Sequence, residues 1–139
     1  MDHSPATARS VTKTVSIDRP VAEVFAFLHD PANWPAWAIA NVKAVEPTDD
    51  PDWWLMTTPH GPARLRIRGD AELGLLDHDY VEERASWQVP ARVVANGTGT
   101  EFMMTLFQPP AFTDGYFDDQ TALVDTELAT LKRLLESGA

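Results

Sequence analysis

The stretch that decides the fold is residues 11–28, which read VTKTVSIDRPVAEVFAFL. Its first half, Val11–Ile17, alternates apolar and polar side chains, which is the pattern of a half-buried strand. Asp18 offers an N-cap carboxylate, and Pro20 suits the first turn of a helix. Behind them four apolar residues recur at helical spacing, namely Val21, Val24, Phe25 and Leu28. We therefore predict a strand followed at once by a short amphipathic helix.

Residues 41–108 have a different pattern, in which short alternating runs are separated by turn residues. They predict six further strands, at residues 41–46, 53–58, 62–69, 74–81, 85–95 and 99–108. The breaks between these runs are only a few residues long, so we expect antiparallel hairpins. Asn96-Gly97, in the last break, is typical of a two-residue hairpin turn.

Two more helices complete the predicted order. Trp34–Trp37 contains a proline and is long enough only for a short second helix. Phe117–Glu136 is predicted to be a long terminal helix that Gly138 ends, because its apolar residues fall on one stripe: Phe117, Val124, Leu128, Leu131 and Leu135. Such a helix is the only element long enough to cover the apolar face of the sheet. The predicted fold class is α+β: a seven-stranded curved antiparallel sheet, two short helices after strand 1, and a long C-terminal helix over the concave face with a cavity between.

Charge and composition exclude several functions. The chain has 11 basic and 21 acidic residues, a net charge of −10 and no cysteine. No disulfide or cysteine nucleophile is available, and the acidic excess disfavours nucleic acid and anionic membranes as partners. Four histidines without compact ligand spacing predict no metal, and we expect no cofactor. We also expect a cytoplasmic protein with a flexible N-terminus at residues 1–10 and a single domain at 11–139, because neither a signal sequence nor an apolar membrane span is evident.

Two segments near the N-terminus, SIDRPVAEVF at 16–25 and DPANWPAW at 30–37, resemble the signature of the START-like, or SRPBCC, superfamily. GLLDH at 74–78 and PARVVANGTGTE at 90–101 are similar to a small bacterial branch labelled polyketide-cyclase-like. The resemblance runs from about residue 11 to 136. It implies the helix-grip fold, which has the element order predicted above, and a site for an apolar small molecule between sheet and helix. Some members of the superfamily catalyse cyclisation or dehydration, and others carry, sense or shield a ligand.

The candidate catalytic residues are His78 and Tyr80. Strand alternation puts them on one face with Leu76, whereas Asp77 points to the opposite face and cannot pair with the His78 ring. A neutral imidazole facing a partly desolvated cavity can move a proton near neutral pH, and Tyr80 can donate a hydrogen bond. Two other interpretations stay open for His78: a buried ring bonded to a backbone carbonyl or to Tyr80, and a ligand contact without catalysis.

The predicted ligand contacts are apolar or aromatic residues of the presumed inner surface, which is almost free of charge. They are Trp34, Trp37, Leu65, Ile67, Leu76, Trp87, Phe102, Met104, Leu106, Phe112, Val124 and Leu128. Methionine and aromatic side chains make an adaptable lining for a ligand, but the same residues also make an ordinary core. Trp34 and Trp37 have the further alternative of packing against the first helix.

Three arginines, Arg64, Arg66 and Arg68, share one face of a strand. They form either an outer stripe paired with Asp79 or Glu101, or an anion clamp in the cavity, which requires a bulge or a bound acid. His60, in a turn, is expected to be solvated.

Trp53 and Trp54 are adjacent in a strand, so one of them points outward. An outward tryptophan is a candidate contact for a homodimer.

Two functions fit these observations. The first is binding of an apolar or aromatic small molecule in the cavity, with cofactor-free cyclisation, dehydration or isomerisation of a polyketide-like substrate as the reaction if there is one. The alternative is a non-catalytic ligand carrier or sensor, or a protein-interaction domain. The alternative is motivated by the lack of any acid-base constellation beyond His78 and Tyr80.

Overall fold

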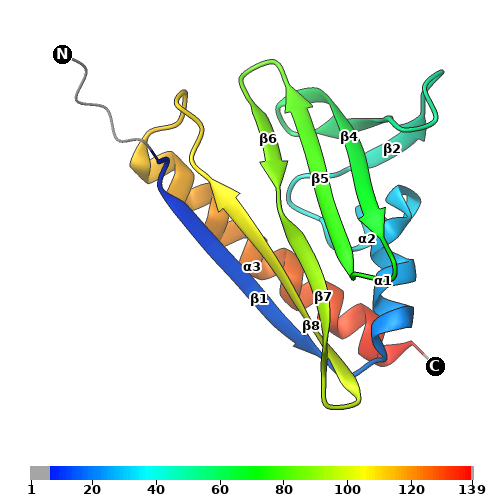
Figure 1. The fold of residues 1–139 in the computed structure, drawn as a ribbon. Coiled ribbons are helices and arrows are strands. Elements are labelled where there is room, and N and C mark those ends of the chain that lie inside the picture. The colour runs from blue at the N-terminus through cyan, green and yellow to red at the C-terminus, as the bar shows by residue number, and fades with distance from the viewer. Residues whose placement is uncertain (1–6, 139) are drawn as a thin grey trace.

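The computed structural model describes residues 7–138 and has the predicted arrangement of a curved sheet gripping a long helix (Figure 1). The helices are α1 (Val21–His29), α2 (Trp34–Trp37), preceded by a 3-10 turn (Pro31–Asn33), and α3 (Asp114–Ser137). The strands are β1 (Ser10–Ile17), β2 (Ala44–Pro47), β3 (Trp54–Thr58), β4 (Gly61–Asp70), β5 (Leu75–Glu82), β6 (Ser86–Val89), β7 (Ala91–Asn96) and β8 (Gly99–Phe107).

The sheet is antiparallel throughout, with the order β1-β8-β7-β5-β4-β3-β2, and β6 pairs with β5 beside this path. It has eight strands rather than seven because the predicted strand 85–95 is interrupted at Pro90. Proline has no N–H to donate to the ladder, and the chain changes partner at this residue. Before it, Trp87 pairs with Tyr80 of β5, and after it, Val93 pairs with Phe102 of β8.

Backbone groups freed by this change of partner find other hydrogen bonds. The Asp77 carboxylate accepts from the Ala91 N–H at 2.9 Å, and the Pro90 carbonyl accepts from the Thr105 N–H at 2.9 Å. Within residues 7–138, the backbone ladder between β7 and β5 consists of one pair, Leu75 with Arg92, beside which the Val93 N–H donates to the Gly74 carbonyl at 2.9 Å. The sheet is therefore loosely joined at its centre, which lets it curve around α3 (Figure 1).

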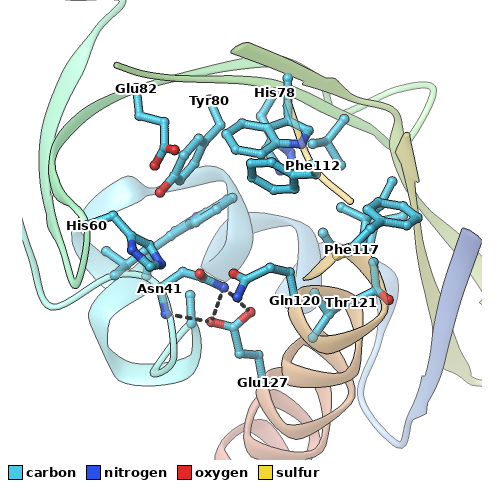
Figure 2. A pocket seen from close by; sticks show the side chains of 18 of the residues that line it. Asn41, His60, His78, Tyr80, Glu82, Phe112, Phe117, Gln120, Thr121 and Glu127 are labelled. Carbon is cyan, nitrogen blue, oxygen red and sulfur yellow. Dashed lines mark hydrogen bonds between the residues drawn. The ribbon is translucent and has the colours of Figure 1, made fainter. Parts of the chain in front are cut away.

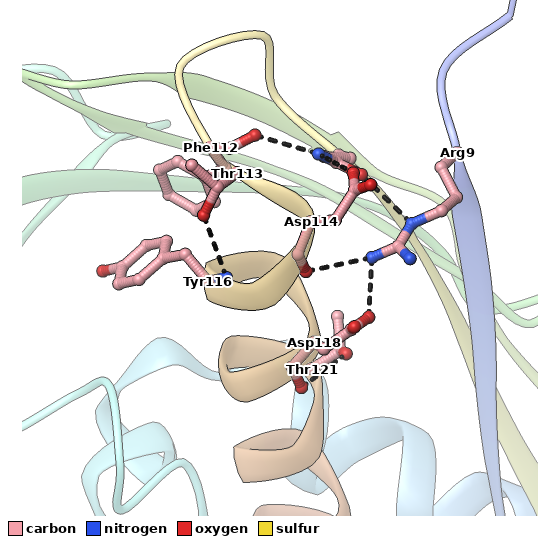
Figure 3. Close-up of polar contacts among 8 residues, drawn as sticks. Arg9, Phe112, Thr113, Asp114, Tyr116, Asp118 and Thr121 are labelled. Atoms are coloured by element: carbon pink, nitrogen blue, oxygen red, sulfur yellow. Dashed lines mark hydrogen bonds and ion pairs between the residues drawn. The ribbon is translucent and has the colours of Figure 1, made fainter.

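Helix α3 begins earlier than predicted, at Asp114, because the Thr113 hydroxyl caps it by accepting from the Tyr116 N–H at 3.2 Å. Around this first turn, the Arg9 guanidinium donates to the Gln108 side chain at 3.1 Å and to Asp118 at 2.6 Å (Figure 3). These bonds fix the start of α3 against the sheet. Residues 1–6 of the predicted flexible N-terminus lie outside the described residues, and β1 already begins at Ser10.

The other end of α3 contacts the connection between β1 and α1. Lys132 donates to the Ser16 carbonyl at 2.7 Å, and Glu136 accepts from the Asp18 N–H at 2.8 Å. The predicted role of Asp18 as N-cap of α1 is wrong: α1 begins at Val21, so Pro20 is the N-cap residue, and proline has no side-chain acceptor to cap the helix. Gly138 follows α3 as its C-cap, with a φ of −70° that any residue can adopt.

No helix within residues 7–138 is both long enough and apolar enough to cross a membrane.

Candidate ligand-binding site

A cavity of about 120 Å³ lies between the inner face of the sheet and helices α2 and α3. Figure 2 shows Tyr80 and His78 entering it from β5, with Glu127 on α3 at the opposite side. Most of the wall is apolar or aromatic. Nine of the predicted site residues line the cavity: Trp34, Trp37, His78, Tyr80, Trp87, Met104, Leu106, Phe112 and Val124.

Five predicted ligand contacts do not line this cavity. Leu65, Leu76, Phe102 and Leu128 are buried in the core, and Ile67 is half-buried beside it. Helix α1 contributes to this difference, because it packs against β5, β7 and β8 and its Val24 and Leu28 belong to the same buried core. Strand alternation predicted the inward face correctly, but it could not show how much of that face α1 covers.

His78 is buried, and its Nδ1 lies 3.0 Å from the Leu76 carbonyl oxygen. The edge of the ring meets Trp34 with centroids 5.0 Å apart. Burial lowers the pKa of His78, although the Leu76 carbonyl and the nearby Asp77 charge act in the opposite direction. The imidazole is therefore neutral near pH 7, with its proton on Nδ1, and Nε2 has no hydrogen-bond partner among the described residues. The hydrogen bond to a backbone carbonyl that the first alternative required is present, and ligand contact and catalysis by His78 stay predictions.

Tyr80 is half-buried and meets Trp87 edge to face, with ring centroids 5.1 Å apart. Burial, followed by the negative charge of Glu82, raises the pKa of Tyr80 to about 12. Its hydroxyl therefore keeps its proton near neutral pH and can act as a hydrogen-bond donor. Asp77 bonds the Ala91 N–H instead of His78, as the prediction of opposite faces requires.

Glu127 is the main feature of the site that the sequence analysis missed. It lines the cavity, is only 4% exposed, and contradicts the expectation of an almost uncharged inner surface. Its Oε2 accepts from the backbone N–H groups of Ala40 and Asn41, both at 3.2 Å, and the Asn41 side-chain amide donates to both oxygens (Figure 2). Burial outweighs these bonds and raises the pKa of Glu127 to about 7.

A signal for Glu127 was present in the sequence. It lies three residues after Val124 and four before Leu131, which are spacings of the apolar stripe of α3. An acidic residue within an apolar stripe is a buried carboxylate candidate.

Several polar and aromatic side chains meet at one end of the cavity, which we call its mouth. His60, Glu82, Arg84 and Phe112 line the cavity there, and Tyr116 contacts three of them from the start of α3. Arg84 pairs with Glu82, donates to the Tyr116 hydroxyl at 2.7 Å, and lies over the Phe112 ring, 5.2 Å from its centroid. His60 is exposed as predicted, and its Nε2 lies 3.4 Å from the Tyr116 hydroxyl. The residues of the mouth come from the β3–β4 turn, the β5–β6 turn and the start of α3. Contacts between segments so far apart in the sequence cannot be predicted from a local pattern.

The three arginines lie on the outer face of the sheet. Arg66 and Arg68 both donate to the buried Asp79 carboxylate, with shortest distances of 2.7 Å and 3.1 Å. Arg64 and Arg66 lie over the Trp53 ring, 4.9 Å and 4.7 Å from its centroid. The outer-stripe interpretation with Asp79 is confirmed, and the anion clamp is wrong because the neighbouring Leu65 faces inward.

Two further expectations concern this outer face. Glu101 accepts from Ser16 and Asn96 rather than from an arginine. Trp53 is the outward tryptophan and is partly covered by guanidinium groups; its role in a homodimer stays a prediction.

Within residues 7–138, no three His, Asp or Glu side chains are grouped so that they could hold a metal ion. The polar groups that line the cavity include the His78 imidazole, the Tyr80 hydroxyl, the Glu127 carboxyl and the Asn41 amide, together with the side chains of His60, Glu82, Arg84, Gln120 and Thr121.

Comparison with known proteins places this architecture in a family. Residues 8–136 match the family described as polyketide cyclase/dehydrase and lipid transport, and the chain belongs to that family. This confirms the resemblance to the SRPBCC superfamily. No curated protein gives a significant match to the sequence.

Solved structures share the helix-grip fold at low sequence identity. An uncharacterized protein from Bacillus thuringiensis has a TM-score of 0.74 and 12% identity, with 91% of this chain and 98% of that chain covered. Ara h 8.0201 has a TM-score of 0.71 and 12% identity, covering 94% and 99%. The di-domain ARO/CYC BexL, from the BE-7585A biosynthetic pathway, has a TM-score of 0.70 and 18% identity, covering 92% of this chain and 46% of BexL.

Proposed function

We propose that this protein binds a small apolar or aromatic molecule in the cavity between the sheet and α3. The proposal rests on the cavity itself. Trp34, Trp87 and Phe112 give it aromatic walls, and a few polar groups can orient a ligand. Membership of a family that includes cyclases, dehydrases and lipid transport proteins supports a site for hydrophobic ligands.

The size of the cavity limits the ligand. Its volume of about 120 Å³ is close to that of an engineered protein cavity of about 150 Å³ that binds benzene. It is smaller than the roughly 300–1,000 Å³ of sites for drug-sized molecules. We therefore infer a ligand built on one aromatic ring or a similar short apolar body. A polycyclic molecule would require the mouth to open.

The test uses 2-phenylethanol, a neutral single-ring probe, with binding followed by amide chemical shifts. We expect saturable shifts confined to residues around the cavity. Val124→Phe fills the cavity and should abolish them, whereas Leu123→Phe on the exposed side of the same helix should not. Absence of saturable binding to the native protein, or equal binding to both variants, would overturn the proposal.

A second candidate function is proton transfer on the bound molecule, as cofactor-free cyclisation, dehydration or isomerisation requires. Its support is the pairing of a neutral His78, whose Nε2 is free to accept a proton, with a protonated Tyr80 that can donate to a carbonyl oxygen. A minimal test is the exchange of the α-hydrogens of phenylacetone in D₂O. We expect the native protein to accelerate the exchange and His78→Gln to lose that acceleration. Equal exchange rates for the two proteins would remove His78 from any catalytic role.

A further inference from the structure

The hydrogen bonds of Glu127 come entirely from neutral donors. Ala40 and Asn41 supply backbone N–H groups, and the Asn41 side chain supplies its amide. A protonated carboxyl has an O–H of its own to donate, and none of these neighbours accepts a hydrogen bond at this point. These N–H contacts favour the ionised carboxylate, although burial outweighs them and raises the pKa of Glu127. Within residues 7–138, Oε1 accepts only from the Asn41 amide, which leaves it able to take a further donor from the cavity side.

No cation is paired with this carboxylate among residues 7–138. Lys43, whose charge acts weakly to lower the pKa of Glu127, donates its ammonium group to the Ile39 carbonyl at 2.8 Å. Across the cavity, the Arg84 charge is matched by Glu82. A buried carboxylate without a cation is costly, because hydrogen bonds from neutral donors replace only part of its hydration.

Aromatic side chains surround the remaining space. Trp34, Tyr80, Trp87 and Phe112 all line the cavity, and Figure 2 shows Tyr80 on the opposite side from Glu127. Faces of aromatic rings attract cations, most strongly where water is excluded. A carboxylate on one wall and aromatic rings on the others together provide the two kinds of group that recognise an organic ammonium ion.

We propose that the cavity binds an organic cation, a protonated primary or secondary amine on a small apolar or aromatic body, with the ammonium group on Glu127. This inference rests on the proposed ligand-binding function and names the chemical class of the ligand. The amine donates to Oε1 and neutralises the buried charge, and its apolar body occupies the space between the aromatic rings. The protein's net charge of −10 also favours approach of a cation.

Proton release should accompany this binding. Near pH 6 the free protein holds Glu127 mostly protonated, because burial raises the pKa of this carboxyl to about 7. An alkylamine remains protonated below about pH 10, so its arrival forces the carboxyl to ionise and to release its proton to the buffer. The other titratable groups that face the cavity are His60, His78, Tyr80, Glu82 and Arg84.

The experiment compares three probes of nearly equal shape and different charge: 2-phenylethylamine, 2-phenylethanol and 3-phenylpropionate. Calorimetric titration at pH 8 should give an affinity for the amine at least about tenfold higher than for the alcohol, and no measurable binding of the acid. At pH 6, titrations in two buffers of different ionisation enthalpy should show proton release with the amine and none with the alcohol.

Glu127→Gln should remove the preference for the amine and the proton release, while 2-phenylethanol still binds. The matched control is Asp119→Asn, which removes one negative charge from the exposed side of the same helix and should change neither. The comparison of three probes on the native protein needs no variant, so it decides the question even if Glu127→Gln does not fold. Equal affinities for amine and alcohol, or tighter binding of the acid, would overturn this inference and leave the proposed function standing. If none of the three probes binds, the proposed function itself fails.

Discussion

Asp79 and Glu127 are acidic residues that are almost completely buried, at 5% and 4% exposure, yet their pKa values move in opposite directions. Burial by itself raises both. At Asp79 the hydrogen bonds and charges of Arg66 and Arg68 outweigh burial and hold the pKa below its usual range. At Glu127 the donors are neutral and burial prevails. The presence or absence of a guanidinium partner therefore separates a structural carboxylate on the outer face from a carboxyl that can titrate in the cavity.

Glu127 should make the stability of the ligand-free protein depend on pH. Its pKa in the folded protein, about 7, lies above the ordinary value of 4.5. Its favourable contribution is therefore complete below the ordinary pKa and is lost as pH rises through about 7, a change on the order of 3 kcal/mol. Urea unfolding at several pH values should show the native protein losing stability between about pH 5 and pH 8 relative to Glu127→Gln. Parallel curves for the two proteins would mean that Glu127 ionises at its ordinary pKa.

At the scale of elements, periodicity predicted the strands, α1 and α3, because each of these presents one apolar face to a common core. It did not reveal the break at Pro90. Trp87, Val89, Ala91 and Val93 keep strict alternation across the proline, so the apolar face continues while the pairing partner changes from β5 to β8. A pattern of side chains records which face is buried, but it does not record which strand lies alongside.

The start of α3 was predicted too late for a similar reason. The apolar stripe begins at Phe117, whereas the first turn before it is fixed by polar contacts: the Thr113 cap and the bonds that Arg9 donates (Figure 3). Sequence periodicity detects only the part of a helix that packs on the core.

The Thr113 cap offers a test of this helix. Thr113→Ala removes the acceptor for the Tyr116 N–H and should lower the free energy of unfolding by about 1 kcal/mol in urea titration. Thr113→Ser keeps the hydroxyl and should retain most of the native stability. Were both variants destabilised equally, the lost threonine methyl group rather than the hydrogen bond would be responsible.

At the scale of the whole molecule, the site arises from the way distant segments converge. The inner residues of β5, β6 and β8 were predictable from alternation. The structure then shows that some of these residues lie in the core with α1, and that others line the cavity. The mouth could not be predicted, because Arg84 and Tyr116 are 32 residues apart and their contact depends on where α3 begins. The sequence thus specifies the wall of the cavity more directly than its entrance.

The mouth should control the rate at which ligands enter and leave. Arg84, which lines the cavity, donates to the Tyr116 hydroxyl at 2.7 Å and so joins the β5–β6 turn to α3. We expect ligands to pass here by separating these two side chains. Tyr116→Phe removes the acceptor but keeps the ring against Phe112 and the Arg84–Glu82 pair. The bond contributes about 1 kcal/mol at an exposed position, so the association and dissociation rates should both rise about fivefold, with little change in Kd.

Line shapes of 2-(4-fluorophenyl)ethanol in ¹⁹F NMR titrations give both rates. The matched control is Asp118→Asn, which weakens the Arg9 contact at the same end of α3 but away from the mouth, and it should leave the rates unchanged. Rates that stay the same in Tyr116→Phe would show that ligands enter elsewhere. A changed Kd with an unchanged association rate would instead show that Tyr116 contacts the bound ligand, because only dissociation would then depend on its hydroxyl.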